Sequence, residues 1–201
     1  MKKSIHWLVS ACLLLTACTS HQKKILIYAN SNIEVDASQK NISVQEGTTQ
    51  VEKELIFSSS DPVILNVKGP QGNFSLEAGE DGYFIANLKP DTLIGSQQHT
   101  GETIRSRITQ DQLKIQLDSL NKLVKGNTIA GKNYFILPGH IEKITSIMNA
   151  KIFGPFHPVP AGFDAGSVPE IYKFYKISEI KDIIDKLTEM SIYKYEKDEK
   201  K

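Results

Sequence analysis

The chain has 201 residues and an almost even charge balance, with 24 Lys and Arg against 23 Asp and Glu and a formal net charge of +1 at pH 7. This balance lacks the pronounced basic field that nucleic-acid binding requires, so no nucleic-acid partner is expected. Hydrophobic residues make up 40% of the chain and charged residues 23%, which is typical of a folded globular body of one domain or two small ones.

The N-terminus has the pattern of a secretory signal peptide. Lys2 and Lys3 precede a mainly apolar run, and small residues then precede Cys18. The run is too short to span a bilayer as a mature anchor. The segment Leu15-Thr16-Ala17-Cys18 resembles the lipobox of bacterial lipoproteins, and this resemblance implies that the Cys18 thiol carries a diacylglyceryl group and that signal peptidase II cuts before it. We therefore predict a signal peptide over residues 1–17.

A second segment, Val9-Ser10-Ala11-Cys12, also fits the lipobox pattern. Cleavage there would leave Leu13-Leu14-Leu15 exposed and would shorten the apolar segment to about seven residues, the lower limit for a signal-peptide core. Cys18 is therefore the preferred site. With Cys12 removed and Cys18 acylated, no disulfide and no cysteine metal site is expected.

Residues 18–24 form the predicted lipid attachment and tether. Fully extended at about 3.3 Å per residue, residues 19–24 reach only about 20 Å, so the body is expected close to the headgroups. Lys23 and Lys24 either interact with anionic headgroups or belong to a solvated linker, and the sequence leaves both alternatives open. In lipoproteins of enterobacterial type an Asp after the cysteine retains the protein in the inner membrane, and Thr19 stands here instead. The resemblance therefore implies an outer-membrane lipoprotein that faces the periplasm.

Residues 25–100 are predicted to form a β-rich domain. Short β-favouring runs cover residues 25–28, 41–44, 51–57, 63–67, 73–76 and 83–88, with turn residues between them. Their spacing of roughly ten residues indicates an antiparallel sandwich or a small barrel. Asp81-Gly82 is interpreted as a hairpin turn and not as a calcium loop, because only Glu77 and Glu80 lie near and the D-x-D spacing is missing.

Residues 101–192 are predicted to form an α/β part. Thr109 and Gln112 make a capping box before an apolar stripe that predicts an amphipathic helix, and the stripe consists of Leu113, Leu117, Leu120 and Val124. Strands are predicted over residues 133–137 and 170–175. Over residues 140–153 helical and strand spacing compete, and a short helix or turn followed by a strand is preferred.

A second amphipathic helix is predicted to begin with Ser178 as its N-cap and to carry the stripe Ile180, Ile183, Ile184, Leu187 and Met190. Residues 193–201 are dense in charge and are expected to form a frayed or disordered tail. The predicted fold class is therefore α+β, an N-terminal antiparallel β-sandwich-like part followed by a mixed part with two amphipathic helices.

Catalytic and metal-binding patterns are poor in this sequence. His99, His140 and His157 are scattered, with no H-E-x-x-H and no paired spacing that would bring two imidazoles to one metal. No G-x-S-x-G, S-x-x-K, phosphate loop or dinucleotide motif occurs. We therefore expect no enzyme, no metal and no cofactor.

Residues 153–169 form a long segment rich in Pro and Gly that contains Phe153, Phe156, His157 and Phe163. Loops of this length are often functional, and exposed aromatic residues form adhesive surfaces. These four residues are therefore predicted to contact a partner. The alternative is that the three Phe side chains fill the core while the prolines stiffen a crossover connection.

Two functions follow from these patterns. The preferred one is a lipid-anchored, periplasm-facing envelope lipoprotein that acts as a non-enzymatic binding or scaffold module for another envelope component. The alternative is a binder of a small molecule or lipid, or a hydrolase with an unrecognised site, whose pocket lies between sheet and helices under the long loop.

Overall fold

The computed structural model describes residues 21–70, 72–98, 117–118, 120–122, 124–125, 133–157, 159–160 and 163–198. Its elements are β1 (Lys23–Ala29), β2 (Ile33–Asp36), β3 (Asn41–Val44), β4 (Val51–Phe57), β5 (Val63–Gly69), β6 (Gly72–Ala78), β7 (Gly82–Asn87), β8 (Leu93–Gln98), β9 (Asn133–Ile136), β10 (His140–Thr145), β11 (Lys151–Phe153), the 3-10 turn η1 (Ala165–Ser167), β12 (Ile171–Lys176) and α2 (Ile177–Asp198). Residues 117–118, 120–122 and 124 are also helical.

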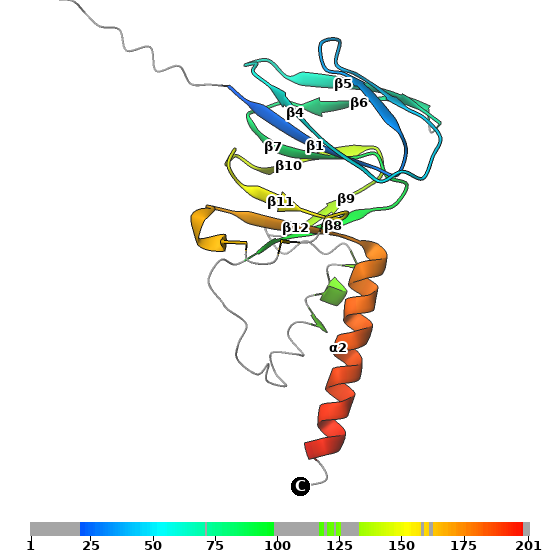
Figure 1. Cartoon of the computed structure of the whole chain (residues 1–201), viewed down its shortest axis with the longest axis vertical. Helices are drawn as coiled ribbons and strands as arrows, with labels where there is room; N and C mark the ends of the chain where they lie inside the picture. Colours follow the sequence, from blue (N-terminus) through cyan, green and yellow to red (C-terminus); the bar gives the residue numbers. More distant parts are fainter. Residues whose placement is uncertain are drawn as a thin grey trace, which may run out of the picture.

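The strands form three sheets of four strands each. The outer sheet has the order β2-β3-β5-β6, the central sheet β10-β7-β1-β4, and the third sheet β11-β12-β8-β9. Figure 1 shows them stacked in this order along the long axis, with α2 beyond the third sheet. Each sheet also contains one parallel pair, namely β3 with β5, β1 with β7, and β11 with β12. The antiparallel arrangement predicted for residues 25–100 is therefore wrong, and all three sheets are mixed.

The inner strands of the central sheet, β1 and β7, are buried on both faces because alternate residues of a strand point to different neighbours. Ile25 and Ile27 of β1 belong to a cluster shared with the outer sheet, here called the first interface. Leu26 and Tyr28 belong to a cluster shared with the third sheet, here called the second interface. Every residue of β7 is buried for the same reason. Among the described strands, those of the outer sheet expose alternate residues to solvent on one face.

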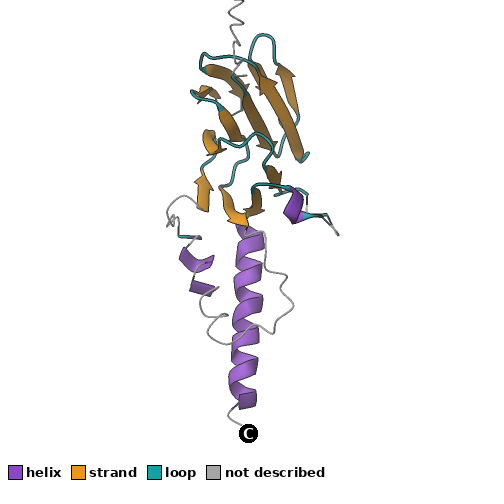
Figure 2. Cartoon of the chain, turned by 90° about the vertical axis from the view of Figure 1, so that its left-hand side faces the viewer, coloured by secondary structure: helices purple, strands orange, loops and turns teal. Residues whose placement is uncertain are grey.

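The third sheet is covered on its far face by helical segments. Ile94 of β8 and Ile180 of α2 are fully buried there, and Leu120 and Val124 pack against them. Leu120 and Val124 belong to the apolar stripe predicted for the first helix, while Thr109, Gln112 and Leu113 lie outside the described residues. Figure 2 shows that α2 then continues away from the sheets.

Strand pairing crosses the boundary predicted at residue 100 in both directions. β8 pairs with β9 and β12 in the third sheet, whereas β10 pairs with β7 in the central sheet. Segments before and after residue 100 therefore share two sheets and the second interface.

Most of the predicted strands are confirmed, and β3 and β4 have the predicted bounds. β2 and β8 were not predicted. The helix or turn preferred after residue 140 is wrong at its start, because β10 is a strand, whereas the strand after it is confirmed as β11. Within the described residues, no helix is long and apolar enough to cross a membrane.

The bounds of α2 differ from the prediction at both ends. The helix begins at Ile177, and the Glu179 carboxylate accepts a hydrogen bond from the Lys176 backbone N–H at 3.0 Å. Lys176 is therefore the N-cap position instead of Ser178, because Glu179 satisfies a free donor of the first turn. The helix continues to Asp198, so most of the segment predicted as a frayed tail is helical.

Candidate functional site

The long segment over residues 153–169, here called the aromatic stretch, begins where β11 ends, at Phe153. At Gly154 the backbone adopts φ = 80°, and a Cβ atom there would lie 2.2 Å from the Phe174 carbonyl oxygen. Only glycine therefore lets the chain turn this close to β12. Of the residues that follow, Phe156 packs on the second interface.

Phe156 covers part of the second interface. Its ring meets Tyr28 edge-to-face, with the ring centroids 5.8 Å apart. The ammonium groups of Lys89 and Lys176 lie 5.7 and 5.6 Å from the centroid of the Phe156 ring. Phe156 is half-buried, so it contacts both the core and solvent. Its surroundings therefore combine features of the partner-contact and the core-filling interpretations.

The other three predicted contact residues also lie at the surface. Phe163 packs edge-to-face on Phe153, with the centroids 4.9 Å apart, and both rings are half-buried. His157 is exposed, and its Nδ1 lies 2.8 Å from Glu52 Oε2 on β4. Val159 is 43% exposed. The stretch therefore links the third sheet to the edge of the central sheet.

A polar cleft of about 430 Å³ adjoins this stretch, and Lys24, Glu52, Glu54, Tyr83, Phe153 and His157 are among its lining residues. It lies between β4 and β11, which are edge strands of the central and third sheets. Two of the four predicted contact residues thus line the cleft, Phe153 and His157. Phe156 and Phe163 lie outside its lining.

The acidic groups of the cleft are paired. The Lys24 ammonium lies 3.1 Å from Glu54 Oε2 and 4.6 Å from the centroid of the Tyr83 ring. The Tyr83 hydroxyl donates a hydrogen bond of 2.5 Å to the same Glu54 oxygen. Strand register explains this cluster, because Lys24 stands beside Tyr83 and Leu26 stands beside Glu54.

Burial sets the protonation of the tyrosines around the cleft. It raises the pKa of Tyr83, and the hydrogen bond to Glu54 raises this pKa further, so Tyr83 is a donor at neutral pH. Burial also raises the pKa of Tyr28, whose hydroxyl has no hydrogen-bond partner among the described residues.

The pKa of Lys173 is lowered by burial, and its ammonium donates to the His157 carbonyl at 3.5 Å.

This arrangement is suited to binding. Paired charges of both signs and two aromatic rings can recognise polar and aromatic groups of a partner. Among the described residues, no three His, Cys, Asp or Glu side chains lie close enough together to hold a metal ion.

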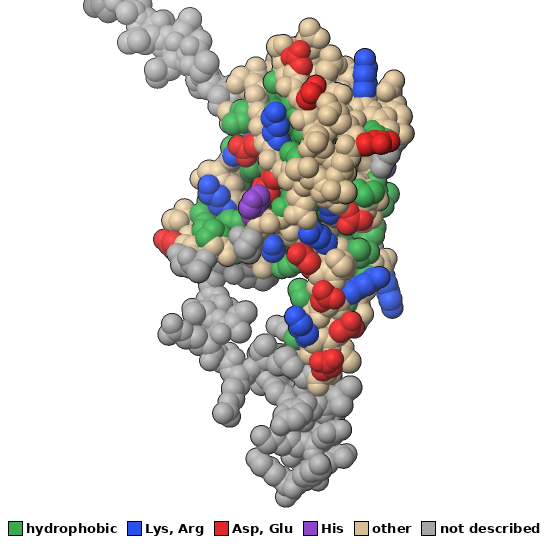
Figure 3. Space-filling model, turned by 45° about the vertical axis from the view of Figure 1, so that its right-hand side comes forward, with side chains coloured by type: hydrophobic (Ala, Val, Ile, Leu, Met, Phe, Trp, Pro, Cys, Tyr) green, Lys and Arg blue, Asp and Glu red, His purple; other side chains and the backbone are tan. Residues whose placement is uncertain are grey.

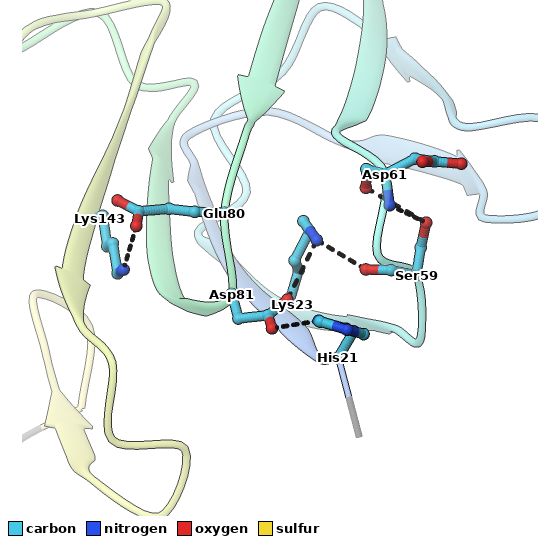
Figure 4. Close-up of polar contacts among 7 residues, drawn as sticks. All are labelled: His21, Lys23, Ser59, Asp61, Glu80, Asp81 and Lys143. Carbon is cyan, nitrogen blue, oxygen red and sulfur yellow. Dashed lines mark hydrogen bonds and ion pairs between the residues drawn. The ribbon is translucent and has the colours of Figure 1, made fainter. Parts of the chain in front are cut away.

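The start of the body is fixed at the turn between β6 and β7 (Figure 4). Asp81 accepts hydrogen bonds from the Lys23 ammonium at 3.2 Å and pairs with His21 Nδ1 at 2.7 Å. Lys23 is fully buried and also donates to the Ser59 carbonyl at 2.7 Å. The hydrogen bond from His21, followed by that from Lys23, lowers the pKa of Asp81. Lys23 was expected either to interact with anionic headgroups or to belong to a solvated linker. Neither alternative holds, because its charge is paired inside the folded body.

The residues missed from the sequence are Lys24, Glu52, Glu54 and Tyr83. Glu52 and Glu54 stand two residues apart in a predicted strand, which indicates that one face of this strand is polar. No local pattern links Glu52 to His157, because 105 residues separate them. Only the fold brings them together.

Comparison with protein-family models, with curated proteins and with solved structures finds no match for this chain.

Proposed function

We propose that this chain is a lipid-anchored, periplasm-facing lipoprotein of the outer membrane whose body is a non-enzymatic binding module for another envelope protein. The lipobox at Cys18 supports the anchor. The observation that carries the binding role is the cleft between β4 and β11, which is bordered by the aromatic stretch. Aromatic side chains with polar surroundings are the residues that protein interfaces enrich.

The anchor holds the body close to the membrane. Between Cys18 and β1 stand only Thr19–Gln22, which span about 13 Å when fully extended. His21 already pairs with Asp81, and the Gln22 carbonyl accepts a hydrogen bond from the Gly82 backbone N–H at 3.1 Å. A partner is therefore sought within the same membrane or next to it.

The anchor is tested by labelling cells with a fatty-acid analogue. Cys18→Ser should take up no label and should remain uncut, whereas Cys12→Ser should be labelled and processed normally. Label on Cys18→Ser would contradict the assigned site.

The binding role is tested by photo-crosslinking in intact cells. A photoreactive residue replaces Val159, two residues after His157 of the cleft, or, as a control of matched exposure, Ile64 on the outer sheet, since these side chains are 43% and 46% exposed. A discrete protein adduct is expected from position 159 and not from position 64. No adduct from position 159, or equal adducts from both, would contradict the proposal.

One observation favours the second candidate, a binder of a small molecule. An apolar pocket of about 240 Å³ opens between the outer and central sheets, where Val44, Val67, Phe74, Leu88 and Pro90 line it. The lining residues of this pocket do not come from the long loop, residues 153–169, as far as the structure describes it. An apolar cavity of about 150 Å³ takes up benzene, so this one has room for a bicyclic ring.

Indole is a suitable probe for that pocket. The single tryptophan, Trp7, lies in the predicted signal peptide, so the mature chain should not mask indole fluorescence. Gly47 lines the pocket, and a Cβ atom there would meet its nearest atom at an ordinary 3.6 Å, which makes Gly47→Phe a suitable blocking variant. Saturable binding that Gly47→Phe abolishes would support this candidate, and absence of saturable binding would contradict it.

A further inference from the structure

The solvent face of the outer sheet carries side chains arranged in rows across its strands. Strand register places Asp36 beside Asn41, Asn41 beside Asn66, and Asn66 beside Ser75. A second row joins Glu34, Ser43, Lys68 and Asn73 in the same way. Since neighbouring strands lie about 4.8 Å apart, each row crosses the sheet in about 14 Å.

These rows contain residues that strands disfavour. Asparagine is depleted in strands, yet Asn41, Asn66 and Asn73 lie in three neighbouring strands on one face. Asn66 is exposed in the middle of β5, whose alternate residues Leu65 and Val67 are buried in the first interface. A departure from local preference without a gain in packing is expected where a residue serves function.

The amides are held in place by one another. The Ser75 hydroxyl donates to Asn66 Oδ1 at 3.2 Å, and Asn66 Nδ2 donates to Asn41 Oδ1 at 3.5 Å. An amide side chain has two donor hydrogens and two acceptor lone pairs, so each asparagine retains capacity for further hydrogen bonds. The row is therefore ordered without being saturated.

A shallow hollow of about 370 Å³ lies over these residues, and the polar side chains that line it are those of Asn41, Asn66, Lys68, Asn73 and Ser75. Only Lys68 among them is charged. In Figure 3 the upper part of the molecule is mostly uncharged polar groups and backbone, with isolated charges. The carboxylates at the neighbouring edge are engaged locally, Asp36 with Ser38 and Glu34 with Gln45.

From these features we infer that the solvent face of the outer sheet binds an uncharged, polyhydroxylated chain, that is, a neutral glycan. Hydroxyl groups are donors and acceptors together and match amide side chains that present both. An exposed strand face also binds oligosaccharides in the OB-fold, a small β-barrel. A protein partner is less suited, because the one large apolar side chain exposed on this face among the described residues is Ile64. This inference goes beyond the proposed function and uses a different surface.

The test measures binding of cellohexaose and maltohexaose to the full mature chain in detergent by isothermal titration calorimetry. Asn66→Val removes the central amide and introduces a residue that strands favour, so the unfolding free energy should be unchanged or slightly higher. Asn149→Ala, at an exposed asparagine in the turn between β10 and β11, is the control.

Saturable binding of at least one hexasaccharide is expected, weakened by about tenfold in Asn66→Val and unchanged in Asn149→Ala. Absence of saturable binding to both sugars, or equal affinity of wild type and Asn66→Val, would overturn the inference. Binding of an oligogalacturonate alone would also overturn it, because charge and not amide recognition would then dominate. Crosslinking from position 159 does not depend on any of these outcomes, so the two proposals fail separately.

Discussion

The two interfaces of the central sheet have the same architecture but different chemistry. The buried residues of the first interface are Ile, Leu, Val, Ala and Phe. The second contains Tyr28, Tyr83, Tyr134 and Tyr172 and adjoins the polar cleft. Because β1 contributes to both interfaces from alternate residues, one strand supports an apolar core on one face and a candidate binding site on the other. Under the proposed function, stability and binding are thus separated by side-chain direction and not by domain.

The largest loss of stability is expected where a fully buried residue of the first interface is truncated. Ile27 is fully buried in the first interface. Ile27→Ala should lower the free energy of unfolding by about 2–5 kcal/mol, because the lost methylene contacts leave a cavity. Urea denaturation measures this value, and a change below about 1 kcal/mol would contradict the close packing of that interface.

Truncation of a residue at the second interface should lower the free energy of unfolding by less than Ile27→Ala does. Phe156 packs on Tyr28 but is half-buried, so Phe156→Ala should cost about 2 kcal/mol, below the roughly 3–5 kcal/mol of a fully buried phenylalanine. The same urea experiment compares it with Ile27→Ala. Loss of most of the stability would assign Phe156 to the core alone.

Removal of the hydroxyl group should change the free energy of unfolding differently at two tyrosines of the second interface. The Tyr134 hydroxyl donates to the buried Ile144 carbonyl at 2.6 Å, and Tyr134→Phe should therefore cost about 1–2 kcal/mol. The Tyr28 hydroxyl is buried without a partner among the described residues, so Tyr28→Phe should be neutral or stabilising. Equal losses in both variants would show that Tyr28 has a partner.

The smallest expected effect is the pH dependence of the stability that Asp81 contributes. The pKa of Asp81 is lowered in the folded chain by its hydrogen bonds with His21 and Lys23, so its contribution to stability is present above the usual value of 3.8 and is lost as the pH falls through the lowered value. The stability difference between wild type and Asp81→Asn should therefore shrink on acidification below pH 4. A difference independent of pH would contradict the ionised pair. Asp61→Asn, at an exposed carboxylate nearby, is the control.

Local patterns predicted most strands but not their partners. Apolar alternation and turn residues are encoded locally, so β3 and β4 could be bounded from the sequence. β8 was missed because Gly95 interrupts its apolar pattern, and the structure supplies the reason: a Cβ atom there would lie 2.3 Å from the Phe174 ring. Parallel pairing is a long-range property that no local pattern contains.

Burial on both sides of a sheet also hides strand signals. In β10, Ile141 packs on the first interface and Ile144 on the second, so a spacing of three residues resembles a helix. The predicted site was found in part for a similar reason. The composition of residues 153–169 identified the aromatic stretch, whereas Lys24, Glu54 and Tyr83 meet only through strand register.

The proposed partner contact lies in the aromatic stretch beside the second interface, whereas the first interface serves stability. It is tested most directly by the crosslinking yield from position 159 in Phe163→Ala and, as a matched control, in Phe57→Ala, since Phe57 is also half-buried but packs on the first interface. We expect a yield reduced by about fivefold in Phe163→Ala, as for an interface residue worth about 1 kcal/mol, and an unchanged yield in Phe57→Ala. An unchanged yield in Phe163→Ala, or an equal reduction in both variants, would contradict it.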